Sequence, residues 1–277
     1  MPYFKSFDDK NIYYIEHQGI KKINIIFLHG WTSTAAFNDY LIKELKEFNV
    51  YMWDARSHGK SDVDEDVTIQ KMAKDLYHFL AEVPNQDNQN FCIGHSMGAL
   101  VLMEYMREFQ GNNISKLGFI DQSPKLITDK EWKLGIYGNF PESLNEEMIK
   151  SFEENLAEGH TKLGMKGLNK EYKERVHNNP EILKAKHNYL KTLNSKAIIQ
   201  IWKDLSVKDY RDVIKKIKLP TLLLYGLKSQ YYLKETGTYM QDQIENSELM
   251  YFEKGDHSPF VEETEKFCNV VRAFALK

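Results

Sequence analysis

The sequence predicts an α/β protein in which a mostly parallel sheet is wrapped by helices and interrupted by one helical insertion. Two observations lead to this class. Short apolar runs rich in Ile, Val, Phe and Tyr alternate with amphipathic stretches of helical length, which is typical of parallel sheets. This alternation stops after residue 123 and resumes at residue 219. The 277 residues, of which 42% are hydrophobic, are enough for two domains or for one large domain with an insertion.

Six apolar runs are predicted as strands, and amphipathic segments between them are predicted as crossover helices. One such segment has Ile69, Met72 and Leu76 at helical spacing, and an earlier one has Leu41 and Leu45. The predicted strands are residues 23–28, 50–53, 91–93, 117–120, 221–225 and 249–252.

The segment without alternation is predicted to be a helical insertion between two strands of one sheet. It has mixed charge and is punctuated by glycines and prolines such as Gly159 and Pro180. A structureless loop of this length is uncommon inside a compact domain. We therefore expect residues 1–123 and 219–277 to form the core and residues 124–218 to form the insertion.

The charge pattern argues against a basic surface that could bind nucleic acid. The chain has 37 Lys and Arg against 40 Asp and Glu, and the two signs are interspersed instead of forming a basic stripe. A small-molecule ligand is therefore expected, and no nucleic acid.

The cysteines and the N-terminus indicate a cytoplasmic protein. Cys92 lies in an apolar run and Cys268 near the end, which predicts two buried, unpaired thiols and no metal site. Charged residues interrupt the N-terminal segment where a signal peptide needs an apolar stretch, and no run approaches the length of a membrane span. We expect no membrane-spanning helix.

The segment 91–100 points to nucleophilic catalysis. A strand enters Gly94-His95-Ser96-Met97-Gly98 and continues into a helix with apolar residues on one face. Glycines on both sides of the serine permit a tight, strained turn that lifts its hydroxyl above the sheet at a helix N-terminus. The pattern predicts Ser96 as the nucleophile.

The first predicted strand ends in His29-Gly30-Trp31, a candidate oxyanion loop. Acyl transfer requires backbone N–H donors directed at the developing oxyanion, and this loop and the residue after the nucleophile can supply them. We predict the N–H groups of Trp31 and Met97 as donors, and we expect His29 and Gly30 to contact the substrate.

A histidine just past the last predicted strand is the candidate base. A serine hydroxyl needs a base within hydrogen-bond reach at neutral pH, and imidazole is suited to this exchange. His257 lies where the last member of a serine, acid, histidine order belongs. The adjacent Asp256 is expected to point elsewhere.

Together these segments resemble the α/β-hydrolase superfamily, in particular its esterase-like and lipase-like serine hydrolases with a helical cap. The resemblance extends from about residue 23 to the last helix. It implies an eight-stranded sheet with the cap after the sixth strand, a Ser-acid-His triad, no cofactor, and cleavage of an ester, thioester, lactone or related acyl bond. The motifs that carry it are His29-Gly30-Trp31, residues 54–62, Gly94 to Gly98, and His257-Ser258-Pro259.

The sequence departs from the family pattern at the triad acid. Members usually carry Asp in the loop after the strand that follows the insertion, where this chain has Ser229. Some lipases of the superfamily take the acid from the end of the preceding strand, and Asp121, shortly before Pro124, has that setting. Asp121 is therefore the predicted acid, with Glu235 or another nearby carboxylate as the alternative. A dyad with Ser229 or water behind the histidine is left open.

Aromatic residues of the insertion are candidates for the pocket wall. Most are expected to form the core of the insertion, but a lid must present some apolar surface to the ligand. Trp132 and Tyr137, just after the strand that carries Asp121, are predicted to line the pocket.

The predicted function is hydrolysis of a small, fairly apolar acyl compound through an acyl-enzyme on Ser96. Acyl transfer, perhydrolysis and carbon–carbon bond cleavage use the same framework and remain alternatives. A receptor that kept the fold and lost turnover is a further alternative, favoured only by the altered acid position.

Overall fold

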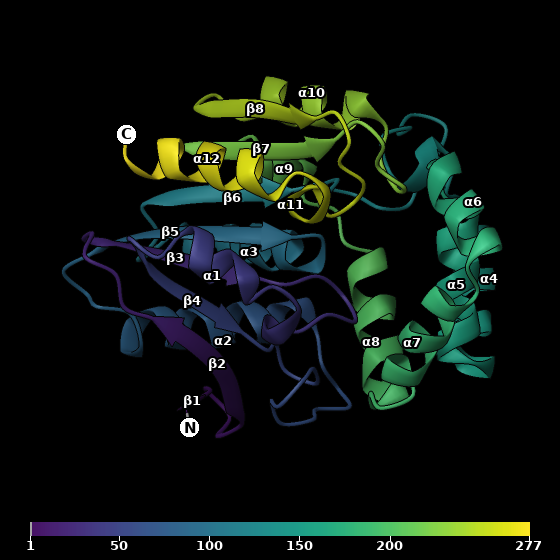
Figure 1. The fold of residues 1–277 in the computed structure, drawn as a ribbon, viewed down its shortest axis with the longest axis horizontal. Coiled ribbons are helices and arrows are strands. Elements are labelled where there is room, and N and C mark those ends of the chain that lie inside the picture. The colour runs from purple at the N-terminus through teal and green to yellow at the C-terminus, as the bar shows by residue number, and fades with distance from the viewer. Residues whose placement is uncertain (1) are drawn as a thin grey trace.

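The computed structural model describes residues 2–277, and its centre is one eight-stranded sheet (Figure 1). The strand order is β1-β2-β4-β3-β5-β6-β7-β8, and all neighbours from β4 to β8 pair in parallel. The strands are β1 (Tyr3–Lys5), β2 (Asn11–His17), β3 (Ile23–Leu28), β4 (Asn49–Trp53), β5 (Gln89–His95), β6 (Lys116–Ile120), β7 (Thr221–Gly226) and β8 (Ser247–Phe252).

The predicted mostly parallel sheet is confirmed, and all six predicted strands form within it. Strands β3 to β7 are almost wholly buried, which explains their continuous apolar runs. The sequence reasoning did not identify β1 and β2. These pair antiparallel at the edge of the sheet, and β2 is half-exposed, so neither shows a continuous apolar run.

Helices cover both faces of the sheet (Figure 1). One face carries α1, α11 and α12, and the other carries α2, α3, α9 and α10. Their bounds are α1 (Tyr40–Glu44), α2 (Ile69–Glu82), α3 (Met97–Phe109), α9 (Arg211–Ile214), α10 (Lys234–Gln243), α11 (Pro259–Glu262) and α12 (Thr264–Ala275), and a short 3-10 turn η1 (Ala35–Phe37) precedes α1.

Between β6 and β7 the chain forms five helices that lie beyond the carboxyl ends of the parallel strands (Figure 1). Three of them begin at an asparagine whose side chain accepts backbone N–H bonds, namely Asn155, Asn169 and Asn194. The helices are α4 (Glu142–Glu154), α5 (Leu156–Lys166), α6 (Lys170–Asn178), α7 (Glu181–Leu190) and α8 (Ser195–Ser206), preceded by the 3-10 turn η2 (Ile136–Gly138). The chain then returns to the sheet, where Ile214 of α9 belongs to the core on the α3 side.

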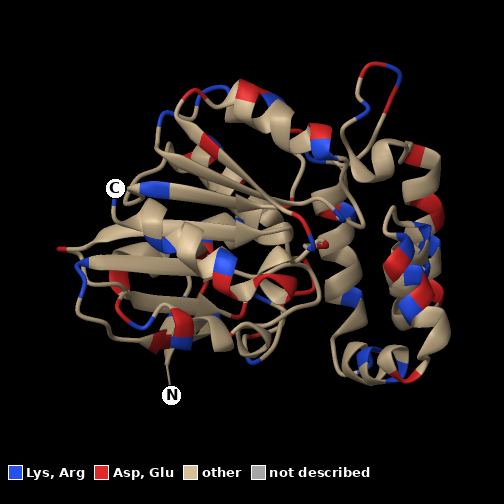
Figure 2. Cartoon of the chain, turned by 45° about the horizontal axis from the view of Figure 1, so that its top comes forward, with Lys and Arg blue, Asp and Glu red and all other residues tan. Residues whose placement is uncertain are grey.

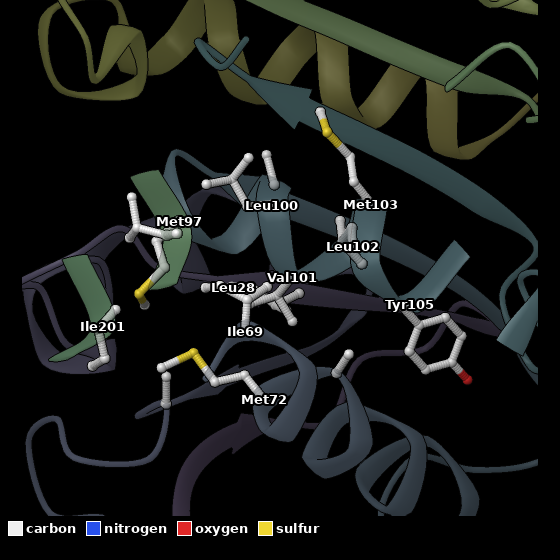
Figure 3. Close-up of a cluster of buried hydrophobic side chains, with 14 of the residues drawn as sticks. Leu28, Ile69, Met72, Met97, Leu100, Val101, Leu102, Met103, Tyr105 and Ile201 are labelled. Carbon is white, nitrogen blue, oxygen red and sulfur yellow. The ribbon is translucent and has the colours of Figure 1, made fainter. Parts of the chain in front are cut away.

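The hydrophobic core on the α2 and α3 side continues into these five helices. Met97 and Leu100 of α3 lie in one cluster with Ile69 and Met72 of α2 and with Ile201 of α8 (Figure 3). The helix that begins at the predicted nucleophile is therefore packed against both the sheet and the insertion.

Surface charge and the thiols follow the sequence analysis. Acidic and basic residues are interspersed over the sheet layer and the insertion (Figure 2). Cys92 and Cys268 are buried and unpaired. Within the part of the chain that the structure describes, no helix has the length and apolar character that a membrane crossing needs.

A buried arginine ties the N-terminal segment to the core. The Arg56 guanidinium has no exposed surface and pairs with Asp75 at 2.6 Å, Asp64 at 2.7 Å and Asp8 at 3.0 Å. Asp75 is equally buried, so water does not solvate these two charges and each is compensated by the other. Burial raises the pKa of Asp75, and the guanidinium acts in the opposite direction.

Asp75→Asn is expected to lower the free energy of unfolding by about 3 kcal/mol, because it leaves Arg56 buried with less compensating charge. Urea denaturation checks this. The matched control is Glu65→Gln, which breaks the exposed pair with Lys196 and should leave the free energy of unfolding nearly unchanged. Equal losses for the two variants would show that burial does not set the energy of the Arg56 network.

Candidate active site

A cavity of about 750 Å³ lies between the carboxyl ends of the strands and the five insertion helices. Its size is within the range of small-molecule pockets. From the core it is lined by residues that include Gly30, Trp31, Ser96, Met97, Tyr231 and His257. From the insertion it is lined by residues that include His160, Leu163, Lys186, Tyr189, Trp202 and Leu205.

Ser96 lies at the turn between β5 and α3 in a strained conformation. Its φ of 51° and ψ of −115° are unusual for a residue with a side chain. A Cβ on Gly98 would lie 2.3 Å from the Leu28 carbonyl oxygen, and one on Gly94 would lie 2.4 Å from Gly98. The two glycines are therefore required because helix, turn and strand approach one another closely.

Two backbone N–H groups near the serine have no internal partner among the described residues, one in the loop after β3 and one at the start of α3. Within residues 2–277, no hydrogen-bond acceptor is found for the N–H groups of Trp31 and Met97. Met97 is the first residue of α3, so helix geometry leaves its N–H free. A Cβ on Gly30 would lie 3.3 Å from the Ser96 Cβ, so glycine keeps this loop close to the serine. Gly30 lines the cavity, as expected.

His29 does not line the cavity, which corrects the expectation that it contacts the substrate. It is fully buried, its Nδ1 donates to the Gly30 carbonyl at 2.8 Å, and its Nε2 accepts the Ala55 N–H at 2.9 Å. His58 accepts the Thr32 N–H in the same way, at 3.2 Å. Burial lowers the pKa of both histidines, so the neutral rings hold the shape of this loop.

His257 and Asp121 form a hydrogen bond of 2.7 Å between Nδ1 and Oδ2. Asp121 has no exposed surface and a left-handed φ of 44° at the end of β6. Its carboxylate also accepts the Ser229 hydroxyl at 2.6 Å and the Gly226 N–H at 3.3 Å. The serine at the usual family position for the acid thus donates to the carboxylate that contacts the histidine.

The other acidic candidates lie elsewhere. Glu235 is exposed on the first turn of α10 and does not line the cavity. Asp256 points away from the His257 ring, as expected: its oxygens accept the N–H groups of Gln230 and His257 at 2.7 Å and the Asn169 amide at 2.9 Å. Among the described carboxylates, Asp121 is the one that bonds the ring of His257.

The environment keeps the imidazole of His257 neutral. Burial lowers its pKa to about 4, with an opposing effect of Asp256 and a further lowering by the charge of Lys186. Burial raises the pKa of Asp121, while its hydrogen bonds with Ser229 and Gly226 favour the carboxylate. A neutral ring with Nδ1–H directed at Asp121 leaves Nε2 able to accept a proton.

Trp132 and Tyr137 do not line the cavity, and the structure corrects that prediction. Trp132 packs edge-on against Tyr239 of α10, and its Nε1 donates to the Lys125 carbonyl. Tyr137 stacks behind Tyr231, with ring centroids 6.1 Å apart. The sequence reasoning failed here because both residues follow β6 in the chain but pack behind the cavity wall.

Two wall residues were missed by the sequence reasoning. Tyr231 meets the His257 ring edge-on, with centroids 4.6 Å apart. His160 stacks on Trp31 at 5.6 Å and hydrogen-bonds to Thr32. Neither lies in a local motif, and no signal in the sequence could have assigned them to the site.

Comparisons with known proteins agree with this fold. A family model described as serine aminopeptidase, S33, matches residues 19–264. The AB hydrolase superfamily protein YisY of Bacillus subtilis is 26% identical over 254 residues, which are 91% of each chain. A pimeloyl-acyl-carrier-protein methyl ester esterase of Vibrio vulnificus is 24% identical over 263 residues, 92% of this chain and 94% of that relative. The solved structure of an esterase from Exiguobacterium antarcticum superposes with a TM-score of 0.84 at 22% identity over 99% of both chains.

The His257 ring is expected to titrate well below the ordinary histidine pKa of 6.5, with a pKa of about 4, because burial disfavours the imidazolium. An NMR titration of the ring protons checks this, and the resonance is identified by its loss in His257→Gln. A midpoint at or above 6.5 would contradict the desolvation that the structure indicates.

Proposed function

Because the chain belongs to the serine aminopeptidase S33 family of α/β-hydrolases, we propose that it is a serine hydrolase for a small ester, thioester or lactone. The observation that carries this proposal is the 2.7 Å hydrogen bond between His257 and Asp121 at the edge of a cavity that Ser96 also lines. The Vibrio relative is named as a methyl ester esterase, which supports ester chemistry for this chain.

In the proposed reaction His257 removes the proton of the Ser96 hydroxyl as the oxygen attacks the acyl carbonyl. Asp121 holds the tautomer with the proton on Nδ1 and stabilises the imidazolium that forms. The N–H groups of Trp31 and Met97 donate to the oxyanion. The imidazolium then protonates the leaving group, and water activated by the same ring releases the acid from Ser96.

The five helices α4 to α8, within residues 124–218, are proposed to act as a lid over this site. Contacts with the core support this: Trp31 Nε1 donates to the Ile198 carbonyl at 2.9 Å, and Asp204 accepts the Ile69 N–H at 2.7 Å. The apolar side chains that α5 and α8 present to the cavity favour a fairly apolar acyl compound. The hydrogen bond between Asp121 and His257 argues against the receptor alternative, whose one support was the altered acid position.

Ester turnover with a dependence on Ser96 is the expected outcome for the purified protein. A series of p-nitrophenyl esters of graded chain length tests it, and Ser96→Ala should lower kcat by roughly five to six orders of magnitude. A fluorophosphonate should label Ser96 alone, as identified by mass spectrometry of the adduct. Turnover or labelling that persists in Ser96→Ala would reject the proposed nucleophile.

Asp121→Asn is expected to lower kcat roughly 10⁴-fold, because the amide no longer holds the correct histidine tautomer. Ser229→Ala should cost far less, since it removes one donor to the carboxylate. Ser229→Asp in the Asp121→Asn background should restore part of the rate, because the Ser229 Oγ lies 2.6 Å from the Asp121 carboxylate. A folded Asp121→Asn protein with a nearly normal rate would show that Asp121 is only a structural residue.

A further inference from the structure

Helix α7 presents one cationic side chain to the cavity. Lys186 is half-buried and lines the cavity, and no hydrogen bond or ion pair of its ammonium is found within residues 2–277. Lys184 on the same helix is different: it is exposed, it lies outside the cavity and it is 3.4 Å from Glu181. The two lysines of α7 therefore differ in their surroundings: Lys184 is exposed to solvent, whereas Lys186 faces the cavity.

The charges around Lys186 do not neutralise it. Asp256 is near enough to raise its pKa, but no ion pair forms between them, and the Asp256 carboxylate already accepts three hydrogen bonds. Glu262 of α11 also lines the cavity, but no ion pair between it and Lys186 is found among the described residues. Arg175 of α6 adds a second cation at the cavity, above the Tyr172 ring.

The charge of Lys186 acts on the active site. Burial lowers its pKa to about 8, and its charge lowers the pKa values of His257 and His160. A desolvated cation without a partner is costly unless a ligand compensates it.

A second unsatisfied donor lies one helical turn away. The Tyr189 hydroxyl is buried and has no hydrogen-bond partner among the described residues, and its ring lines the same cavity. Residues three apart share a helix face, so Tyr189 and Lys186 both lie on the side of α7 that borders the cavity, although the Tyr189 hydroxyl itself is buried. The adjoining walls from α3, α5 and α8 are apolar and include Leu100, Leu163 and Leu205.

We propose that Lys186 binds an anionic group of the substrate, so that the enzyme prefers esters whose chain carries a carboxylate or a similar anion. This inference rests on the proposed function, since it takes Ser96 as the point of attack. The apolar walls would enclose the chain between the ester and the anion. Lys186 is then a specificity-determining residue, and it does not take part in the proton transfers.

The test compares esters of matched length with and without a terminal charge. In one arm the anion is on the acyl side, as in the p-nitrophenyl monoester of adipic acid against p-nitrophenyl heptanoate. In the other it is on the alcohol side, as in 6-acetoxyhexanoate against hexyl acetate. The wild-type protein should prefer the anionic ester in one arm. Lys186→Met should lower the ratio of kcat/KM values in that arm by roughly 10- to 100-fold, the usual effect of losing a hydrogen bond to a charged group.

Lys184→Met is the matched control, and its ratio should equal that of the wild type. Equal ratios for wild type and Lys186→Met in both arms would overturn the inference, as would an equal loss in Lys184→Met.

Calorimetry with Ser96→Ala separates the two proposals, because it needs no turnover. If the anionic ester binds Ser96→Ala and binds Ser96→Ala/Lys186→Met more weakly, the anion site is supported. If, in addition, the wild-type protein hydrolyses no ester, the proposed function is rejected but the anion site is not. Hydrolysis of neutral esters with no effect of Lys186 on anion binding would reject the anion site alone.

Discussion

A single buried carboxylate joins the ends of three strands. Asp121 ends β6 and accepts hydrogen bonds from Gly226 at the end of β7, from Ser229 just beyond it and from His257 after β8. Because the carboxylate has no exposed surface, each donor offsets part of its desolvation cost. The orientation of the His257 ring depends on its bond to this carboxylate, and the bonds from Gly226 and Ser229 hold the carboxylate in place.

Close packing constrains the other half of the site. Side chains on the glycines that flank Ser96 would collide, one on Gly98 with the Leu28 carbonyl at the end of β3 and one on Gly94 with Gly98. Neutral, buried His29 and His58 hold the loop after β3 by backbone hydrogen bonds, which keeps the Trp31 N–H free of an internal acceptor. In the proposed reaction, donors held in this way would need no rearrangement when charge develops on the substrate. The insertion contributes to the site by forming part of the cavity wall and by placing the charge of Lys186 there.

The sequence by itself determined the features that follow from local rules. Continuous apolar runs identified the buried parallel strands, because strands covered on both faces need no polar alternation. The Gly-x-Ser-x-Gly turn predicted Ser96 as the nucleophile from a few neighbouring residues, and the order of the motifs along the chain predicted His257 as the base. The half-exposed strands β1 and β2 lack such a signal. Asp121 was favoured over Glu235 only through the resemblance to a known superfamily.

Only the tertiary structure decided which side chains meet. Asp121 and His257 are 136 residues apart, and their contact follows from the pairing of β6 with β7 and of β7 with β8. The same holds for the wall of the cavity. Tyr231 and Lys186 line it, whereas Tyr137 stacks on Tyr231 and does not reach the cavity. Sequence patterns report whether a position is apolar, exposed or in a turn. They do not report distances between segments that pack together only when the sheet and the insertion are in place, because those distances are set by the packing of the whole chain.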